Sequence, residues 1–217
     1  MIKETHSTES EVGRRIQMAS MTFGSLSSCL WSRSEISKDT KMSIFKTAVM
    51  PTLLYGCETW VPIAEDIHRF EVVQMRCLRK ILKISINDHK SNKEIRKIAN
   101  IQTIESRIRQ KRLLWFGHVN RMESNRTPLK VCGSVSKNEL GWKKKEGWRR
   151  RNGGAYKKWS HVVKSDVQKT IIDNYKRRKI REEVEFAKTL TKCVKTWEEF
   201  VERVCNAPPP KTRMMMT

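Results

Sequence analysis

The segment that decides the fold is TESEVGRRIQMASMTFGSLSSCL, which runs from Thr8 to Leu30. Its apolar residues are spaced alternately four and three apart, at Val12, Ile16, Ala19, Phe23, Leu26 and Leu30. This spacing places all of them on one face of an α-helix. Thr8 and Glu11 match a capping box, a pair that marks the start of a helix. The segment therefore predicts an amphipathic helix with one buried side.

Similar spacing indicates two further helices downstream. The second should start after Ser37, and Pro51 should end or kink it, because proline has no N–H to donate. Its apolar residues are Ile44, Phe45, Ala48 and Val49. The third should run from about Asp66 to Lys83, with inward residues at Ile67, Phe70, Cys77, Leu78, Ile81 and Leu82.

Two more helices complete this region. Ser91 and Glu94 form a second capping box, and Asn100 is a plausible end for the short helix after it. The fifth helix should carry Ile104, Ile108, Trp115, Phe116 and Val119. No segment shows the alternating pattern of a β-strand. The sequence therefore predicts an all-α protein.

Composition divides the chain into four regions. Residues 1–125 are helical in pattern, whereas residues 126–157 hold Pro128 and five glycines and include the basic stretch GWKKKEGWRRRNGG. We expect this second region to be a basic irregular linker. Helical spacing returns over residues 158–205, with Trp159, Val162, Val163 and Val167 inward, and residues 206–217 should form a disordered tail.

The last helical region carries two rows of apolar residues spaced seven apart. One row is Ile180, Ala187, Val194 and Val201, and the other is Leu190, Trp197 and Val204. Rows of this kind form the seam of a coiled coil. Two outcomes stay open: the seam docks on the core of its own chain, or residues 180–204 mediate self-association.

The charge of the chain points to a polyanionic partner. Lys and Arg total 45 against 23 Asp and Glu, a formal net charge of +22. RNA or DNA is the leading candidate partner, ahead of an acidic membrane surface. No apolar run is long enough for a membrane-spanning helix, and a membrane is not among the partners we expect. The six cysteines show no Cys-x-x-Cys pair, which suggests reduced thiols in an intracellular protein. KKKEGWRRR and YKRRKIR are consistent with nuclear import.

The stretch KRLLWFGHVNRM, from Lys111 to Met122, contains a candidate functional histidine, His118. No Ser, Cys or acid motif lies near it for catalysis, and no His or Cys lies three or four residues away to share a metal. The favoured interpretation is a structural residue at a packed helix end, where Gly117 allows close backbone approach. A phosphate or base-stacking contact is the alternative. No cofactor-binding motif occurs, so we expect neither cofactor nor metal.

Several motifs resemble, in order, the C-terminal region of non-LTR (LINE-type) retrotransposon reverse transcriptases, over residues 11–167. RRIQMASMTFGSL and LWSRSEISKDTKMSIFKTAVMPTLLYGCETW look like the region just after the catalytic palm of that family. FEVVQMRCLRKILKIS resembles its next helix, RIRQKRLLWFGHVNRM its signature R-L-R-W-x-G-H-V-x-R-M, and KKWSHVVKSDV its pattern R-W-x-D-x-V-x-x-D-L. Leu114 replaces the second arginine of the signature, His161 replaces an aspartate, and Trp142 and Trp148 stand where arginines are usual.

The resemblance implies a helical, thumb-like region that grips template and primer, and no polymerase activity. Polymerase chemistry needs clustered carboxylates that hold two metal ions, and the family supplies them from the palm. This chain is expected to begin where the palm would end. It has no Asp-Asp pair, and its aspartates at positions 39, 66, 88, 166 and 173 are isolated.

Phosphate contacts are expected from the basic helices and the linker. Between Arg76 and Arg121 thirteen Lys and Arg face three acids, although a merely solvated helix face is the alternative. Trp142 and Trp148 could stack on unpaired bases, although a decayed linker is as consistent with the pattern. The expected nucleic-acid-binding residues are Arg76, Arg79, Lys80, Arg107, Arg109, Lys111, Arg112, Arg121, Trp142, Lys143, Lys144, Lys145, Trp148, Arg149, Arg150, Arg151, Lys157 and Lys158.

Overall fold

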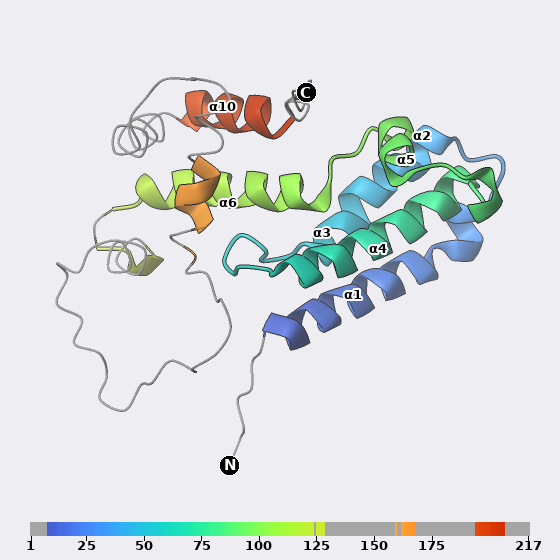
Figure 1. Cartoon of the computed structure of the whole chain (residues 1–217), viewed down its shortest axis with the longest axis horizontal. Coiled ribbons are helices and arrows are strands. Elements are labelled where there is room, and N and C mark those ends of the chain that lie inside the picture. Colours follow the sequence, from blue (N-terminus) through green and yellow to red (C-terminus); the bar gives the residue numbers. More distant parts are fainter. Residues whose placement is uncertain (1–7, 124, 129–158, 160–161, 168–193, 207–217) are drawn as a thin grey trace, which may run out of the picture. The chain divides into compact units, whose positions relative to one another are not determined.

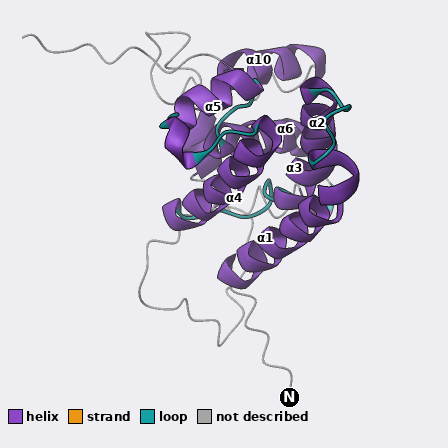
Figure 2. Cartoon of the chain, turned by 90° about the vertical axis from the view of Figure 1, so that its right-hand side faces the viewer, coloured by secondary structure: helices purple, strands orange, loops and turns teal. Residues whose placement is uncertain are grey.

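The computed structural model describes residues 8–123, 125–128, 159, 162–167 and 194–206 (Figure 1). The described residues form helices joined by turns and loops and contain no strand (Figure 2), which confirms the all-α prediction. The chain divides into two compact units, Met1–Ile108 and Arg109–Thr217. The division between the units falls inside a helix. Most of the expected linker, residues 129–157, and the expected tail from residue 207 lie outside the described residues.

The first unit starts with helix α1, Thr8–Ser25, followed by the π-helix η1, Ser27–Trp31. The predicted stripe is buried at Val12, Ala19, Phe23 and Leu30, and Ile16 and Leu26 pack against the same core. At the end of η1 the indole N–H of Trp31 donates to the carbonyl oxygen of Phe23 at 2.7 Å. The two rings stack with centroids 4.7 Å apart. This contact turns the chain back onto α1.

The next helical stretch has three parts: α2, Lys38–Ile44; the π-helix η2, Phe45–Val49; and α3, Met50–Leu53. Ser37 caps it as expected, because its hydroxyl accepts a hydrogen bond from the N–H of Thr40 at 3.1 Å. The interruption predicted at Pro51 occurs earlier, in η2. Pro51 itself lies in the first turn of α3, where a missing N–H costs no helical hydrogen bond.

Helix α4, Ala64–Leu82, crosses the core of the first unit. All of its predicted inward residues are buried except Ile67, which is half-buried and packs against the same core. A short 3₁₀ turn η3, Ile86–Asp88, leads to α5, Asn92–Ala99. Helix α4 packs against α1, α2 and α5, and α1 also packs against α3 (Figures 1 and 2).

The predicted capping box of α5 is present in full. The Ser91 hydroxyl accepts from the N–H of Glu94 at 3.3 Å, and the Glu94 carboxylate accepts from the N–H of Ser91 at 2.8 Å. Asn100 ends the helix with a left-handed φ of 47°. Asparagine tolerates this conformation better than most residues. Both ends of α5 therefore lie where the sequence predicts them.

Helix α6, Ile104–Asn120, begins in the first unit and continues into the second. Ile104 and Ile108 belong to the core of the first unit. The second unit has its own core, formed by α6, the helical residues 162–167 and α10, Val194–Asn206. Its buried residues are Leu113, Val163, Val167, Trp197, Phe200, Val201 and Cys205.

Trp197 packs directly over Gly117 in this second core. The indole N–H of Trp197 donates to the carbonyl oxygen of Leu113 at 2.8 Å. A Cβ atom at Gly117 would lie 2.2 Å from Nε1 and 2.3 Å from Cδ1 of that indole. The predicted close approach at Gly117 is therefore present, and its occupant is a tryptophan ring. Trp197 and Val201 of the heptad seam are buried in their own unit, whereas residues 180–193 lie outside the described part.

The two cores bury some cysteines and leave another exposed. Cys57, Cys77 and Cys205 are buried and Cys29 is exposed, and none of these four cysteines forms a disulfide. Cys132 and Cys193 lie outside the described residues. Within the described residues, no helix has the length and apolarity needed to cross a membrane.

We predict that Gly117→Ala destabilises the protein by about 1–3 kcal/mol, the usual cost of overfilling a packed site. Alanine's better helix propensity acts in the opposite direction by up to about 1 kcal/mol. The sign of the change in the free energy of unfolding therefore shows which of the two effects is larger. Gly13→Ala in α1 is the matched control, because its Cβ would meet its nearest atom, Arg69 Nη2, at an ordinary 3.8 Å. Urea unfolding followed by circular dichroism measures both variants. A Gly117→Ala variant at least as stable as the wild type would contradict the Trp197 contact.

Candidate nucleic-acid interface

Helix α4 carries a row of exposed residues along the face that points away from the core. His68, Val72, Arg76 and Lys80 are each four residues apart, and all four are exposed. A spacing of four keeps side chains on one side of a helix. The row therefore presents two permanent cations and one histidine to solvent, beside an exposed valine.

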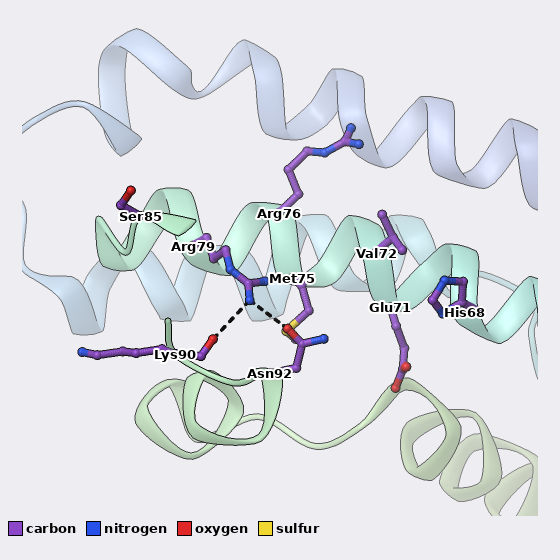
Figure 3. A pocket seen from close by; sticks show the side chains of 9 residues that line it. All are labelled: His68, Glu71, Val72, Met75, Arg76, Arg79, Ser85, Lys90 and Asn92. Atoms are coloured by element: carbon purple, nitrogen blue, oxygen red, sulfur yellow. Dashed lines mark hydrogen bonds between the residues drawn. The ribbon is translucent and has the colours of Figure 1, made fainter. Parts of the chain in front are cut away.

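A groove of about 450 Å³ borders this row, between α4 and the segment that leads into α5. Its lining is shown in Figure 3 and consists of His68, Glu71, Val72, Met75, Arg76, Arg79, Ser85, Lys90 and Asn92. The Arg79 guanidinium crosses from α4 to the other wall, where it donates to Asn92 Oδ1 at 2.9 Å and to the Lys90 carbonyl oxygen at 3.4 Å. Arg76 also lines the groove, and its side chain points away from that of Arg79 (Figure 3).

The groove carries a net positive charge. Arg76, Arg79 and Lys90 contribute three cations, and the one acid among the lining residues is Glu71. Glu71 Oε1 already faces Arg96 Nη1 at 3.6 Å, so its charge is largely compensated from α5. An anionic group entering the groove would meet arginine and lysine side chains beside the apolar Val72 and Met75.

Three residues of α4 were expected to contact phosphates: Arg76, Arg79 and Lys80. They differ in how many interactions their side chains already make within the protein. Lys80 Nζ donates to Ser27 Oγ at 2.7 Å and lies 5.8 Å from the centre of the Phe23 ring. Arg79 and Lys80 also occupy the last turn of α4, where cations favour the helix dipole. The side chain of Arg76 forms no hydrogen bond or ion pair with the described residues. Arg76 is therefore the best-placed of the three for a phosphate.

In the second unit, Arg112 is part of a buried ion pair rather than an exposed contact. Its side chain is only 6% exposed, and Nε and Nη2 lie 2.9 and 2.7 Å from Asp166 Oδ2. Arg109 Nε lies 3.5 Å from the other oxygen, Oδ1. Arg112 thus neutralises a buried carboxylate and is removed from the expected phosphate contacts. Sequence reasoning missed this partnership because Arg112 and Asp166 are 54 residues apart.

Cys205 lies in the electrostatic field of the same cluster. Burial raises the pKa of the Cys205 thiol to about 11, while Arg109 lowers it and Asp166 raises it further. At neutral pH the side chain is therefore an uncharged thiol, and its place in the core is that of a small apolar residue.

The structure places His118 at the end of α6 as expected, but exposed rather than packed. Its ring lies 5.4 Å from that of Trp115, with the planes tilted by 39°. Two aromatic residues were expected to anchor the helix. Phe116 packs against Trp197 with ring centroids 6.1 Å apart, whereas Trp115 is half-buried and contacts the ring of His118.

The remaining expected residues are spread along the chain. Arg107 is exposed in the first unit, and Lys111 and Arg121 are half-buried in the second. The linker candidates all lie outside the described residues, namely Trp142, Lys143, Lys144, Lys145, Trp148, Arg149, Arg150, Arg151, Lys157 and Lys158. The groove adds two residues that were not singled out, His68 and Lys90. The four-residue spacing from His68 to Arg76 is the signal that could have found the histidine.

The chain matches no protein-family model, no curated protein and no solved structure. Among the described residues, no group of three His, Cys, Asp or Glu side chains is arranged to hold a metal ion.

We predict that alanine substitutions at two arginines affect different properties of the protein. Arg112→Ala should lower stability by up to about 3–5 kcal/mol, because it removes both Arg112 contacts to Asp166 Oδ2 and leaves the buried carboxylate with only the longer Arg109 contact at 3.5 Å. Arg76→Ala should change stability by less than about 0.5 kcal/mol, since its side chain is exposed, and should weaken nucleic-acid binding. Thermal unfolding and anisotropy titrations measure the two effects. Equal stability losses in both variants would refute the division of roles.

Proposed function

We propose that this chain is a nucleic-acid-binding segment of a non-LTR retrotransposon reverse transcriptase, comprising the thumb-like region and the post-thumb segment, without polymerase activity of its own. The observation that carries the proposal is the cationic groove on α4, whose Arg76 is exposed and whose single acid is already paired. The +22 net charge of the whole chain supports it.

Contact between two motifs gives the resemblance additional support. RIRQKRLLWFGHVNRM contains Arg112, and KKWSHVVKSDV contains Asp166 at a position where the family pattern also has an aspartate. The two segments are far apart in the sequence, and the Arg112–Asp166 ion pair joins them in the second core. A shared buried ion pair is a physical reason for the two motifs to occur together in one chain.

Binding through the groove would be electrostatic and nearly independent of base sequence. Arg79 is held in place by Lys90 and Asn92, so it loses little side-chain freedom when it meets a phosphate. Arg76 is unconstrained and can adapt to the backbone of a strand. Contacts to phosphates fix the position of a protein along nucleic acid but carry little sequence information.

Asp66, Asp88 and Asp166 have structural roles that suit a non-catalytic segment. Asp66 Oδ2 accepts from the N–H of Ile63 at 3.2 Å at the start of α4, and Asp88 Oδ2 accepts from the N–H of Ser85 at 2.7 Å. Asp166 neutralises Arg112. A polymerase needs carboxylates that converge on two metal ions.

We therefore predict no primer extension by the purified chain with Mg²⁺ or Mn²⁺. Primer extension that an aspartate substitution abolishes would overturn this part of the proposal.

An interaction protein that associates through its heptads is the other function the sequence suggests. The described part of the seam is buried in its own unit at Trp197 and Val201, so no structural observation favours that alternative.

We predict that affinity for RNA and DNA falls steeply with salt. If about six phosphates are neutralised, a plot of log affinity against log salt concentration should have a slope of about −4 to −5, the smaller magnitude applying to single strands. Replacing Arg76 and Lys90 by alanine should weaken binding to all sequences alike and flatten the slope by about 1.4–1.8, because two phosphate contacts are lost. Fluorescence anisotropy on labelled RNA, single-stranded DNA and duplex DNA provides the measurement.

A variant with the same loss of charge serves as the control. Arg33→Ala with Lys38→Ala removes two exposed cations that do not line the groove, and it should change the slope less than the groove variant does. Equal effects would assign binding to net charge rather than to the groove. A wild-type affinity that barely changes with salt would refute the proposed function itself.

A further inference from the structure

Helix α6 has two different sides in the second unit. One side is covered: Trp197 lies over Leu113 and Gly117, and Asp166 pairs with Arg112. Lys111, Trp115 and His118 are spaced at intervals of four and three, which gathers them on one face. Measured around the helix axis from Gly117 at about 100° per residue, His118 lies about 100° away, Lys111 about 120° and Trp115 about 160°. The docking of Trp197 therefore decides which side of α6 meets solvent.

The solvent side holds an aromatic pair. His118 is exposed and Trp115 is half-buried. Their ring planes are inclined by 39°, with centroids 5.4 Å apart, so neither ring lies flat over the other. Neither side chain belongs to the buried core of the second unit. Aromatic surface in contact with water is unfavourable, and packing in the core does not account for this pair of an exposed and a half-buried ring.

Charge on the same face indicates which kind of ligand could cover the rings. Lys111 lies one turn before Trp115, and the chain as a whole carries a net charge of +22. A base with its phosphate combines a flat apolar surface with a negative charge, and so fits both features. In single strands, bases stack on aromatic side chains while nearby cations hold the backbone.

We propose that Trp115 and His118 form a stacking platform for an unpaired base. This inference rests on the proposed nucleic-acid binding and adds a strand preference to it. Duplexes bury the faces of their bases, so the platform gives the chain a preference for single-stranded RNA or DNA.

Two strands of equal charge test the platform directly. One is a labelled oligothymidine, and the other is an abasic strand of the same length, which keeps the phosphates and lacks the bases. The wild type should bind oligothymidine more tightly than the abasic strand. Trp115→Ala should weaken oligothymidine binding roughly five- to hundredfold, the range expected for the loss of one stacked base, and leave abasic binding unchanged.

Control variants separate stacking from folding. Tyr55→Ala removes another exposed aromatic side chain, in the first unit, and should leave the difference between the strands unchanged. Trp115→Phe and His118→Phe should keep most of the preference, whereas His118→Ala should reduce it. Circular dichroism checks that each variant is folded. If Trp115→Ala does not fold, His118→Ala provides the test, because loss of the imidazole should reduce the preference for oligothymidine and an unchanged preference would overturn the platform.

The outcomes distinguish this inference from the function on which it rests. Equal wild-type affinity for the two strands, unaffected by substitutions at Trp115 and His118, would overturn the platform and leave phosphate-driven binding intact. Binding of neither strand would overturn both. Preserved base preference in Trp115→Ala would likewise overturn the platform, because the bases would then be held elsewhere.

Discussion

A single indole lying across one glycine organises the second unit. In an α-helix the carbonyl of Leu113 would normally accept only the N–H of residue 117, yet here it also accepts the indole N–H of Trp197. This shared carbonyl is reachable because Gly117 has no side chain. The contact anchors α10 on α6 and places Phe200, Val201 and Cys205 of α10 in the same core. The outward direction of Trp115 and His118 is a consequence of it.

Local features of the fold could be predicted from the sequence, whereas contacts over long distances could not. Helix starts at Ser37 and Ser91 depend on residues three positions away, so short patterns predict them well. The Arg112–Asp166 pair depends on how two distant helices meet, and no local spacing encodes that. Helical spacing alone does not predict the exposure of His118, because Phe116 also lies about 100° from Gly117 yet packs against Trp197.

The candidate site was predictable only in part, because charge alone does not separate binding residues from structural ones. Arg112 neutralises a buried acid, and the buried Lys41 donates to the carbonyl oxygens of Trp31 and Arg33. Arg79 joins two walls of the groove. Each of these cations looks like Arg76 in the sequence. Their surroundings differ only after folding, so a net charge of +22 overstates the number of side chains that can reach a phosphate.

The π-helix η1 determines the direction around the helix axis in which the residues after it point. In this segment the N–H of Trp31 bonds to the carbonyl of Leu26, five residues earlier, and Ser32 bonds to Ser27 in the same way. A π-helical turn holds one residue more than an α-helical turn, so it shifts the residues after it by roughly 100°. The extra residue turns the Trp31 indole toward the Phe23 carbonyl. A deletion of one residue between 27 and 30 would spare the helix but aim that ring at solvent, so the number of residues here matters as much as their identity.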